Sequence, residues 1–253
     1  MVLALRRALP RGARPTGGKG APLPRRSDSI STSTRRRAEA IVERLAILEL
    51  PTLVVLDGEG RELGRVVGYE DAASWTRAAR EALSASDPMV ALEAEHARDP
   101  SDPLAALALG EALLSREPER GLALLERVTL RPDEHAARAL WLVGRYTQRV
   151  RGDASASRWI WQSLGERFPD SRHARDAWWW YATAQAKLGR PELGSAALQE
   201  RVRRAPRDVT AILEWNRFAA RHGHEPARAA IRAAAMTALE TRAASSVISW
   251  RRP

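Results

Sequence analysis

Residues 50–69 read LPTLVVLDGEGRELGRVVGY, and this stretch decides the fold expected for the first part of the chain. Thr52 to Leu56 is a short run of β-branched and apolar residues, which is typical of a strand buried on both faces. Asp57 to Gly60 supplies the residues of a tight turn, and Glu62 to Val67 predicts a returning strand. The stretch therefore predicts a β-hairpin.

Helices are predicted on both sides of this hairpin. Before it, residues 38–45 carry Ile41 and Leu45 one helical turn apart. After it, residues 71–83 predict a helix whose apolar residues are spaced for one buried face: Ala72, Trp75, Ala79 and Leu83. The predicted order is helix, strand, turn, strand, helix.

This order resembles the C-terminal half of a thioredoxin-fold domain, over about residues 38–83. The resemblance implies a cis peptide bond between Leu50 and Pro51, with Pro51 beside a redox site and Thr52 opening the next strand. An X-Pro bond is the one peptide link that adopts cis at low cost. A proline at a strand entrance is also routine in trans, because it has no N–H to give to the ladder.

The chain contains no cysteine, so it lacks the reactive thiols on which the activity of that family depends. Disulfide exchange requires a thiolate. The Cys-x-x-Cys pair that the resemblance implies would fall near Arg11, in sequence that resembles neither a strand nor a helix. The chain as written therefore cannot catalyse thiol chemistry, and no catalytic residue or cofactor is predicted.

Nearly all of the net charge lies in residues 1–37, which hold ten Lys and Arg residues against a single acid, Asp28, in a chain of net charge +10. The segment is rich in proline, glycine and serine, so it is predicted to be a basic disordered tail. It could be an arm that contacts nucleic-acid phosphates, a transit-like leader, or sequence translated from a misassigned start. The third explanation fits a GC-rich gene, since Lys19 and Lys187 are the only lysines.

No apolar run approaches the roughly 18 residues of a membrane span. The segment Met1-Val2-Leu3-Ala4-Leu5 is also too short for a signal peptide. A soluble protein without a membrane partner is therefore expected, with the cytoplasm as its compartment.

After about residue 87, a pattern recurs that predicts stacked helix pairs. Pro132, Pro169 and Pro206 follow one another at spacings of 37, each close to an aspartate. Residues 135–144 also match residues 173–182 at an offset of 38. Internal periods of this size are typical of repeated supersecondary units. The expected units are residues 103–132, 134–169, 172–206 and 208 to about 240.

The third unit resembles a tetratricopeptide repeat most closely. Its large, small and proline positions are occupied by Trp178, Tyr181, Ala182, Gly194, Leu198 and Pro206, although Arg201 stands where a small residue is usual. The expected fold class is α+β, a partial thioredoxin-like segment followed by an all-α repeat array. The expected domains are residues 1–37, 38–86, 87–245 and a tail at 246–253.

The run Trp178-Trp179-Trp180-Tyr181 has two interpretations. Consecutive helical positions point about 100° apart, so the rings can fill the interfaces on both sides of one helix, together with Trp141, Trp159 and Trp161. Alternatively, exposed rings line a groove for a partner, and nearby polar side chains also contact that partner. The partner-binding candidates are Arg145, Arg175, Trp178, Tyr181 and Gln185.

Two short motifs resemble metal sites only superficially. His222-Gly223-His224-Glu225 lacks the spacing of zinc ligands and is better interpreted as a turn between helices. Asp57-Gly58-Glu59-Gly60 lacks the further ligands of a calcium loop and is better interpreted as the hairpin turn. No metal site is predicted.

These observations favour a non-catalytic scaffold that binds a protein or peptide partner. The first alternative is a thiol-disulfide oxidoreductase whose Cys-x-x-Cys half is missing from this sequence. The second is a nucleic-acid-associated protein that acts through the basic tail, which would make its binding sensitive to salt.

Overall fold

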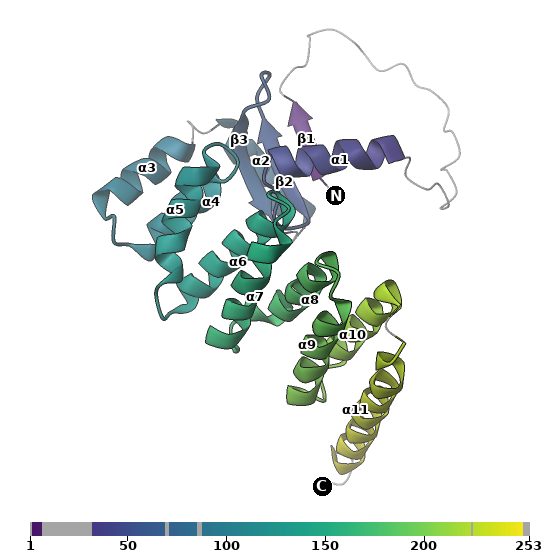
Figure 1. Ribbon diagram of the computed structural model, residues 1–253. Helices are drawn as coiled ribbons and strands as arrows, with labels where there is room; N and C mark the ends of the chain where they lie inside the picture. The colour runs from purple at the N-terminus through teal and green to yellow at the C-terminus, as the bar shows by residue number, and fades with distance from the viewer. Residues whose placement is uncertain (1, 7–31, 69–70, 85–87, 224, 250–253) are drawn as a thin grey trace, which may run out of the picture. The chain divides into compact units, whose positions relative to one another are not determined.

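The structure, a computed structural model, describes residues 2–6, 32–68, 71–84, 88–223 and 225–249 (Figure 1). The chain divides into two compact units, residues 1–116 and 117–253. The first unit combines a small sheet with helices, and the second consists of helices within its described residues.

The sheet of the first unit has three strands in the order β1-β2-β3: Val2–Arg6, Thr52–Leu56 and Glu62–Val67. Strand β2 pairs with β3 in antiparallel fashion, with Thr52 opposite Val67, and an irregularity falls between Val55 and Leu56. All five residues of β2 are buried. The hairpin predicted from the sequence is confirmed.

Strand β1 corrects the prediction that residues 1–37 form a disordered tail. It pairs with β2 in parallel fashion, with Val2 opposite Thr52 and Arg6 opposite Leu56. The physical reason is that a central strand has two edges of backbone N–H and C=O groups, and the hairpin satisfies only one of them. Helix α1 also begins at Thr32, before the expected boundary at residue 38. The rest of that segment, residues 7–31, lies outside the described residues.

The described residues of the first unit form four helices: α1 (Thr32–Arg44), α2 (Ala72–Ser84), α3 (Pro88–Arg98) and α4 (Pro103–Leu113). Helix α2 packs on β2 and β3, and α3 packs on α4. The indole N–H of Trp75 donates to the carbonyl of Gly68 at 2.8 Å. Ala72 is exposed, whereas Trp75 and Ala79 are half-buried, so the predicted face of α2 is only partly covered at these positions.

The domain boundaries differ from those expected. Helices α3 and α4 cluster with the sheet, and the division falls after Arg116 rather than after residue 86. The expected first repeat, residues 103–132, is therefore split between the two units. At the other end, helix α11 (Ala227–Ser249) continues past residue 245, the expected end of the repeats.

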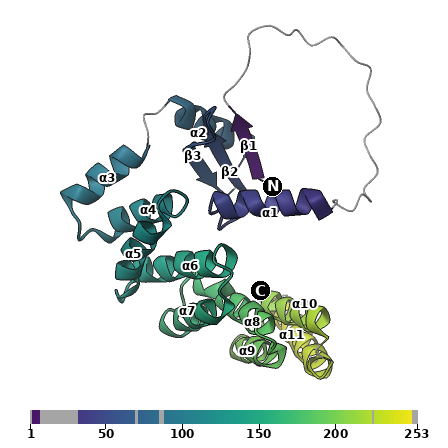
Figure 2. The same ribbon diagram turned by 45° about the horizontal axis from the view of Figure 1, so that its top comes forward.

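Seven helices in the described part of the second unit pack in chain order, each against the next (Figures 1 and 2). Before α11 come α5 (Pro118–Thr129), α6 (Glu134–Arg149), α7 (Ala154–Arg167), α8 (Ala177–Lys187), α9 (Pro191–Arg204) and α10 (Val209–His222). A short 3-10 turn, Ala174–Asp176, precedes α8. Helices α5, α7 and α9 end just before Pro132, Pro169 and Pro206, as the repeat pattern predicts.

Small residues let neighbouring helices of the second unit approach closely. A Cβ atom added to Gly144 would lie 2.8 Å from the Trp161 ring, and one added to Gly165 would lie 2.7 Å from the Trp178 ring. A Cβ on Gly194 would lie 2.8 Å from the carbonyl oxygen of Ala182. Gly194 and Ala182 therefore occupy the close contact that the repeat motif predicts for them.

Candidate functional site

A cleft of about 510 Å³ lies in the second unit, between the connection from α7 to α8 and the C-terminal half of α9. Trp178 of α8 lines it beside the small residues Ala174, Ala197 and Ala205. Charged side chains complete the lining, and the basic ones are Arg172, Arg175, Arg201 and Arg204. The cleft thus combines an aromatic ring and small apolar side chains with guanidinium groups.

Two of these arginines are already paired with carboxylates. The Nε group of Arg204 lies 2.8 Å from the Glu200 carboxylate, which Arg203 also contacts at 2.7 Å. The hydrogen bonds from Arg203 and Arg204 lower the pKa of Glu200 to about 2. Arg201 pairs with Glu214 of α10 and lies 3.4 Å from Asp208. These four charged side chains of the lining, Glu200, Asp208, Arg201 and Arg204, are therefore already paired without a ligand.

The other two arginines have no carboxylate partner within the part of the chain that the structure describes. Arg172 donates from its Nε group to the Nε2 atom of His173 at 3.2 Å, and Arg175 makes no polar contact with a described residue. Asp170 is the remaining acidic residue of the lining, and it is unpaired as well. The unpaired charges of the cleft are therefore two positive and one negative.

The aromatic run contacts helices on both sides of α8. The Trp178 ring lies against Gly165 of α7, and it meets the Tyr181 ring in an edge-to-face arrangement with a centroid distance of 5.7 Å. Trp179 lies 6.4 Å from Phe218 of α10, and Trp180 lies 6.3 Å from Trp161 of α7. The structural interpretation of the run predicts this arrangement.

Among the other tryptophans, Trp161 is fully buried and Trp141 is nearly so, as expected for the same core. Trp159 differs, because 58% of it is exposed. The guanidinium of Arg158 lies 4.2 Å from the centre of the Trp159 ring.

Two predicted partner-binding residues lie in the interior instead. Arg145 is only 6% exposed, with its guanidinium 3.9 Å from the centre of the Trp180 ring. Gln185 is 1% exposed and donates to the Tyr181 hydroxyl at 2.8 Å. Neither side chain lines the cleft, so the burial of Arg145 and Gln185 gives no support to the prediction that a partner contacts them. Arg175 and Trp178 are the two candidates that the structure brings together in the cleft.

Leu50, Pro51 and Thr52 belong to the first unit. The peptide bond between Leu50 and Pro51 is cis, as the resemblance implies. The backbone N–H of Gly68 donates to the carbonyl of Pro51 at 2.9 Å, and the Thr52 hydroxyl donates to the carbonyl of Glu49 at 2.8 Å. These contacts are structural, and the chain offers no thiol to act beside them.

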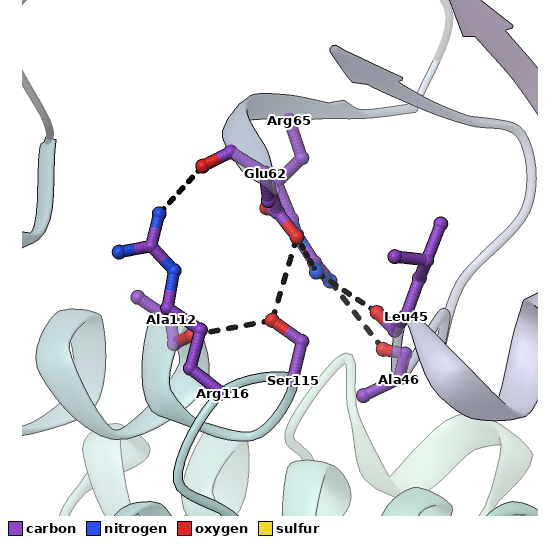
Figure 3. A network of polar contacts seen from close by, with 7 residues as sticks. All are labelled: Leu45, Ala46, Glu62, Arg65, Ala112, Ser115 and Arg116. Carbon is purple, nitrogen blue, oxygen red and sulfur yellow. Dashed lines mark hydrogen bonds and ion pairs between the residues drawn. The ribbon is translucent and has the colours of Figure 1, made fainter. Parts of the chain in front are cut away.

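A polar network of the first unit centres on Glu62 and Arg65 (Figure 3). Two nitrogen atoms of Arg65 donate to the Glu62 carboxylate at 2.7 and 2.6 Å. Arg65 also donates to the carbonyl oxygens of Leu45 and Ala46 at 2.9 and 3.4 Å. From the end of α4, the Ser115 hydroxyl lies 3.4 Å from the Glu62 carboxylate, and Arg116 donates to the Glu62 carbonyl at 2.6 Å. The network ties β3 to α4.

No group of three metal-binding side chains occurs among the described residues. Gly223 closes α10 in the left-handed region with φ of 64°, and the His222 ring lies 4.6 Å from that of Phe218. His224 lies outside the described residues. The Asp57 carboxylate accepts hydrogen bonds from the backbone of Glu59 and Arg61, which fixes the hairpin turn.

No protein-family profile matches the chain, and no curated protein matches it. The crystal structure of MamA matches 70% of this chain and 99% of its own length, with 14% identity and a TM-score of 0.47. Within the described part of the chain, every helix is too short or too polar to cross a bilayer.

Proposed function

We propose that the chain is a non-catalytic scaffold that binds a protein or peptide partner through its second unit. The observation that carries this proposal is the cleft beside Trp178, which is lined by small apolar side chains and by arginines. Stacked helix pairs present extended surfaces without any reactive group. The volume of about 510 Å³ falls within the range of roughly 300 to 1,000 Å³ that is typical of ligand-binding clefts.

For the first unit, the same proposal is that it is a thioredoxin-like remnant without redox chemistry. The order of α1, β2, β3 and α2 agrees with the order that the resemblance implies. Its central polar residues, Glu62 and Arg65, are engaged with backbone and side-chain groups of the same unit. A nucleic-acid role would rest mainly on residues 7–31, outside the described part of the chain, so it is not proposed.

The experiment that tests this function selects a displayed library of random peptides on the immobilised full-length chain. Enriched sequences are then synthesised, and their binding is measured by titration calorimetry. The proposal expects peptides that share a sequence pattern and bind with micromolar dissociation constants, roughly −8 kcal/mol. The absence of any enriched peptide that binds the soluble chain would count against a peptide-binding function.

A further inference from the structure

The cleft has a counterpart one repeat earlier, and comparing the two shows what the cleft lacks. We call the contact between α7 and the connection from α5 to α6 the first seam, and that between α9 and the connection from α7 to α8 the second seam. Residues of α7 and α9 correspond at a spacing of 37, which matches Ile160 with Ala197 and Phe168 with Ala205. Two bulky apolar side chains of the first seam are thus replaced by methyl groups in the second.

Arginines at corresponding positions also behave differently in the two seams. In the first seam, Arg167 donates to the carbonyl oxygens of Thr129 and Arg131 at 2.9 and 3.1 Å. Its counterpart in the second seam, Arg204, pairs with Glu200 on its own helix. The first seam is therefore bridged by hydrogen bonds, whereas the second is open over the volume of the cleft.

Trp178 is the aromatic side chain left beside this opening. The tryptophan 37 residues later, Trp215, is 2% exposed and donates its indole N–H to the Ser195 hydroxyl at 2.9 Å. Trp178 is only partly buried, and its indole N–H has no hydrogen-bond partner within the described part of the chain. A ligand in the cleft would therefore meet an apolar ring and an unused donor.

The geometry points to a defined class of partner segment, and this inference rests on the proposed function. We infer that the second seam binds a segment in which one bulky apolar side chain, of the size of phenylalanine, is flanked by carboxylates. The apolar side chain lies against Ala197 and Ala205, whose counterparts one repeat earlier are Ile160 and Phe168. The carboxylates pair with Arg172 and Arg175. These two arginines outnumber the one unpaired acid of the lining, Asp170, so the unpaired charge of the cleft is net positive.

The test uses the full-length chain and the capped peptide Asp-Glu-Phe-Glu-Asp, with binding measured by fluorescence anisotropy at low salt. The control peptides are Asp-Glu-Ala-Glu-Asp and Lys-Lys-Phe-Lys-Lys. We expect the first peptide to bind at least tenfold more tightly than either control. Equal binding of all three peptides, or no binding of the first, would overturn the inference.

Variants then place the binding in the second seam. The double variant Ala197→Ile, Ala205→Phe fills the cleft with the residues of the first seam, so it should weaken binding at least tenfold while the helical content is retained. Ala196→Ile, at an exposed position next in sequence, is the matched control and should bind as the unmodified chain does. If the filled variant folds poorly, Arg175→Glu tests the same site and should also weaken binding tenfold, with Arg221→Glu on α10 as its control.

The outcomes separate this inference from the proposed function. If library-selected peptides bind the filled variant as tightly as the unmodified chain, the scaffold function stands and the inference that the second seam is its binding site is overturned. Loss of binding in both the filled variant and Arg175→Glu, with both controls unchanged, would establish the site.

Discussion

Arg201 of α9 pairs with Glu214 of α10 at repeat positions where the preceding helices have Leu164 and Ala177, each 37 residues earlier. Leu164 and Ala177 are fully buried. The side chains of Arg201 and Glu214 are only 10% and 17% exposed. An apolar pair in one repeat is thus replaced by a largely buried ion pair at the same two positions of the next repeat. Burial raises the pKa of Glu214, and Arg201 offsets only part of that effect.

The first prediction concerns this pair. Glu214→Ala should lower the free energy of unfolding by about 3 kcal/mol, because it leaves the guanidinium of Arg201 largely buried without its main carboxylate. The double variant Arg201→Leu, Glu214→Ala restores the residues of the preceding repeat and should be as stable as the unmodified chain, or more so. Urea unfolding followed by circular dichroism measures both. A double variant less stable than Glu214→Ala alone would contradict the correspondence of the two positions.

The second prediction concerns Gly165 and Trp178. Gly165→Ala should destabilise the chain by about 1 to 3 kcal/mol through overpacking, because the new Cβ would lie 2.7 Å from the Trp178 ring. In a Trp178→Ala background the same change should instead stabilise α7 by up to about 1 kcal/mol, since alanine favours helix over glycine. Thermal unfolding of the four proteins measures this reversal of sign. Equal effects in both backgrounds would show that the ring does not rest on Gly165.

The loss of Trp178 is a separate prediction within that series. Trp178→Ala removes a partly buried ring and should cost about 3 kcal/mol through lost transfer energy and a cavity. A variant that keeps its melting temperature and loses only peptide binding would show that the ring serves the cleft alone.

The third prediction concerns pH. Hydrogen bonds from Arg203 and Arg204 hold the pKa of Glu200 at about 2, below the usual glutamate value of 4.5. A carboxylate whose pKa is lowered by folding stabilises the folded state above the unfolded pKa, and this contribution is lost as the pH falls towards 2. A carbon-detected NMR titration of the Glu200 carboxylate should show a midpoint near 2. In the variant Arg203→Ala, Arg204→Ala the midpoint should move towards 4.5, and an unchanged midpoint would assign the shift to another cause.

The fourth prediction concerns the Glu62–Arg65 network. Their side chains are 13% and 16% exposed, so Glu62→Ala leaves a largely buried guanidinium without a carboxylate. We expect a loss of about 2 to 3 kcal/mol in the first unit, seen as faster hydrogen exchange of the backbone amides of β2 and β3. Ser115→Ala removes only two long contacts, at 3.4 Å to Glu62 and 3.5 Å to the carbonyl of Ala112, and is the control, with little change expected. Equal exchange rates in the two variants would argue against this network as an anchor.

Local patterns predicted the elements whose causes are local. The apolar run at Thr52–Leu56 and the prolines after α5, α7 and α9 each determine an element boundary through neighbouring residues. Strand β1 was missed because its partner β2 is distant in the sequence and parallel pairing leaves no short-range signal. The burial of Arg145 depends on the Trp180 ring of another helix, which the spacing of residues within α6 does not reveal.

The cleft itself had a sequence signal that only the fold makes interpretable. Ala197 and Ala205 are unremarkable alone, and their meaning appears when Ile160 and Phe168 are placed at the same positions of the preceding helix. Smaller side chains leave an opening only where side chains of the neighbouring helices do not fill the space, and the spacing of residues in the sequence does not show those contacts.

The measurement that tests the account most directly is an NMR map of peptide binding on the isotope-labelled full-length chain. Titration with Asp-Glu-Phe-Glu-Asp should shift the indole N–H signal of Trp178 and the backbone amides of Ala197 and Ala205 most strongly. The indole signal of Trp215, which is buried and hydrogen-bonded, should move little. Shifts concentrated in the first unit or around Trp215, with the Trp178 indole unchanged, would contradict the claim that the second seam is the docking site.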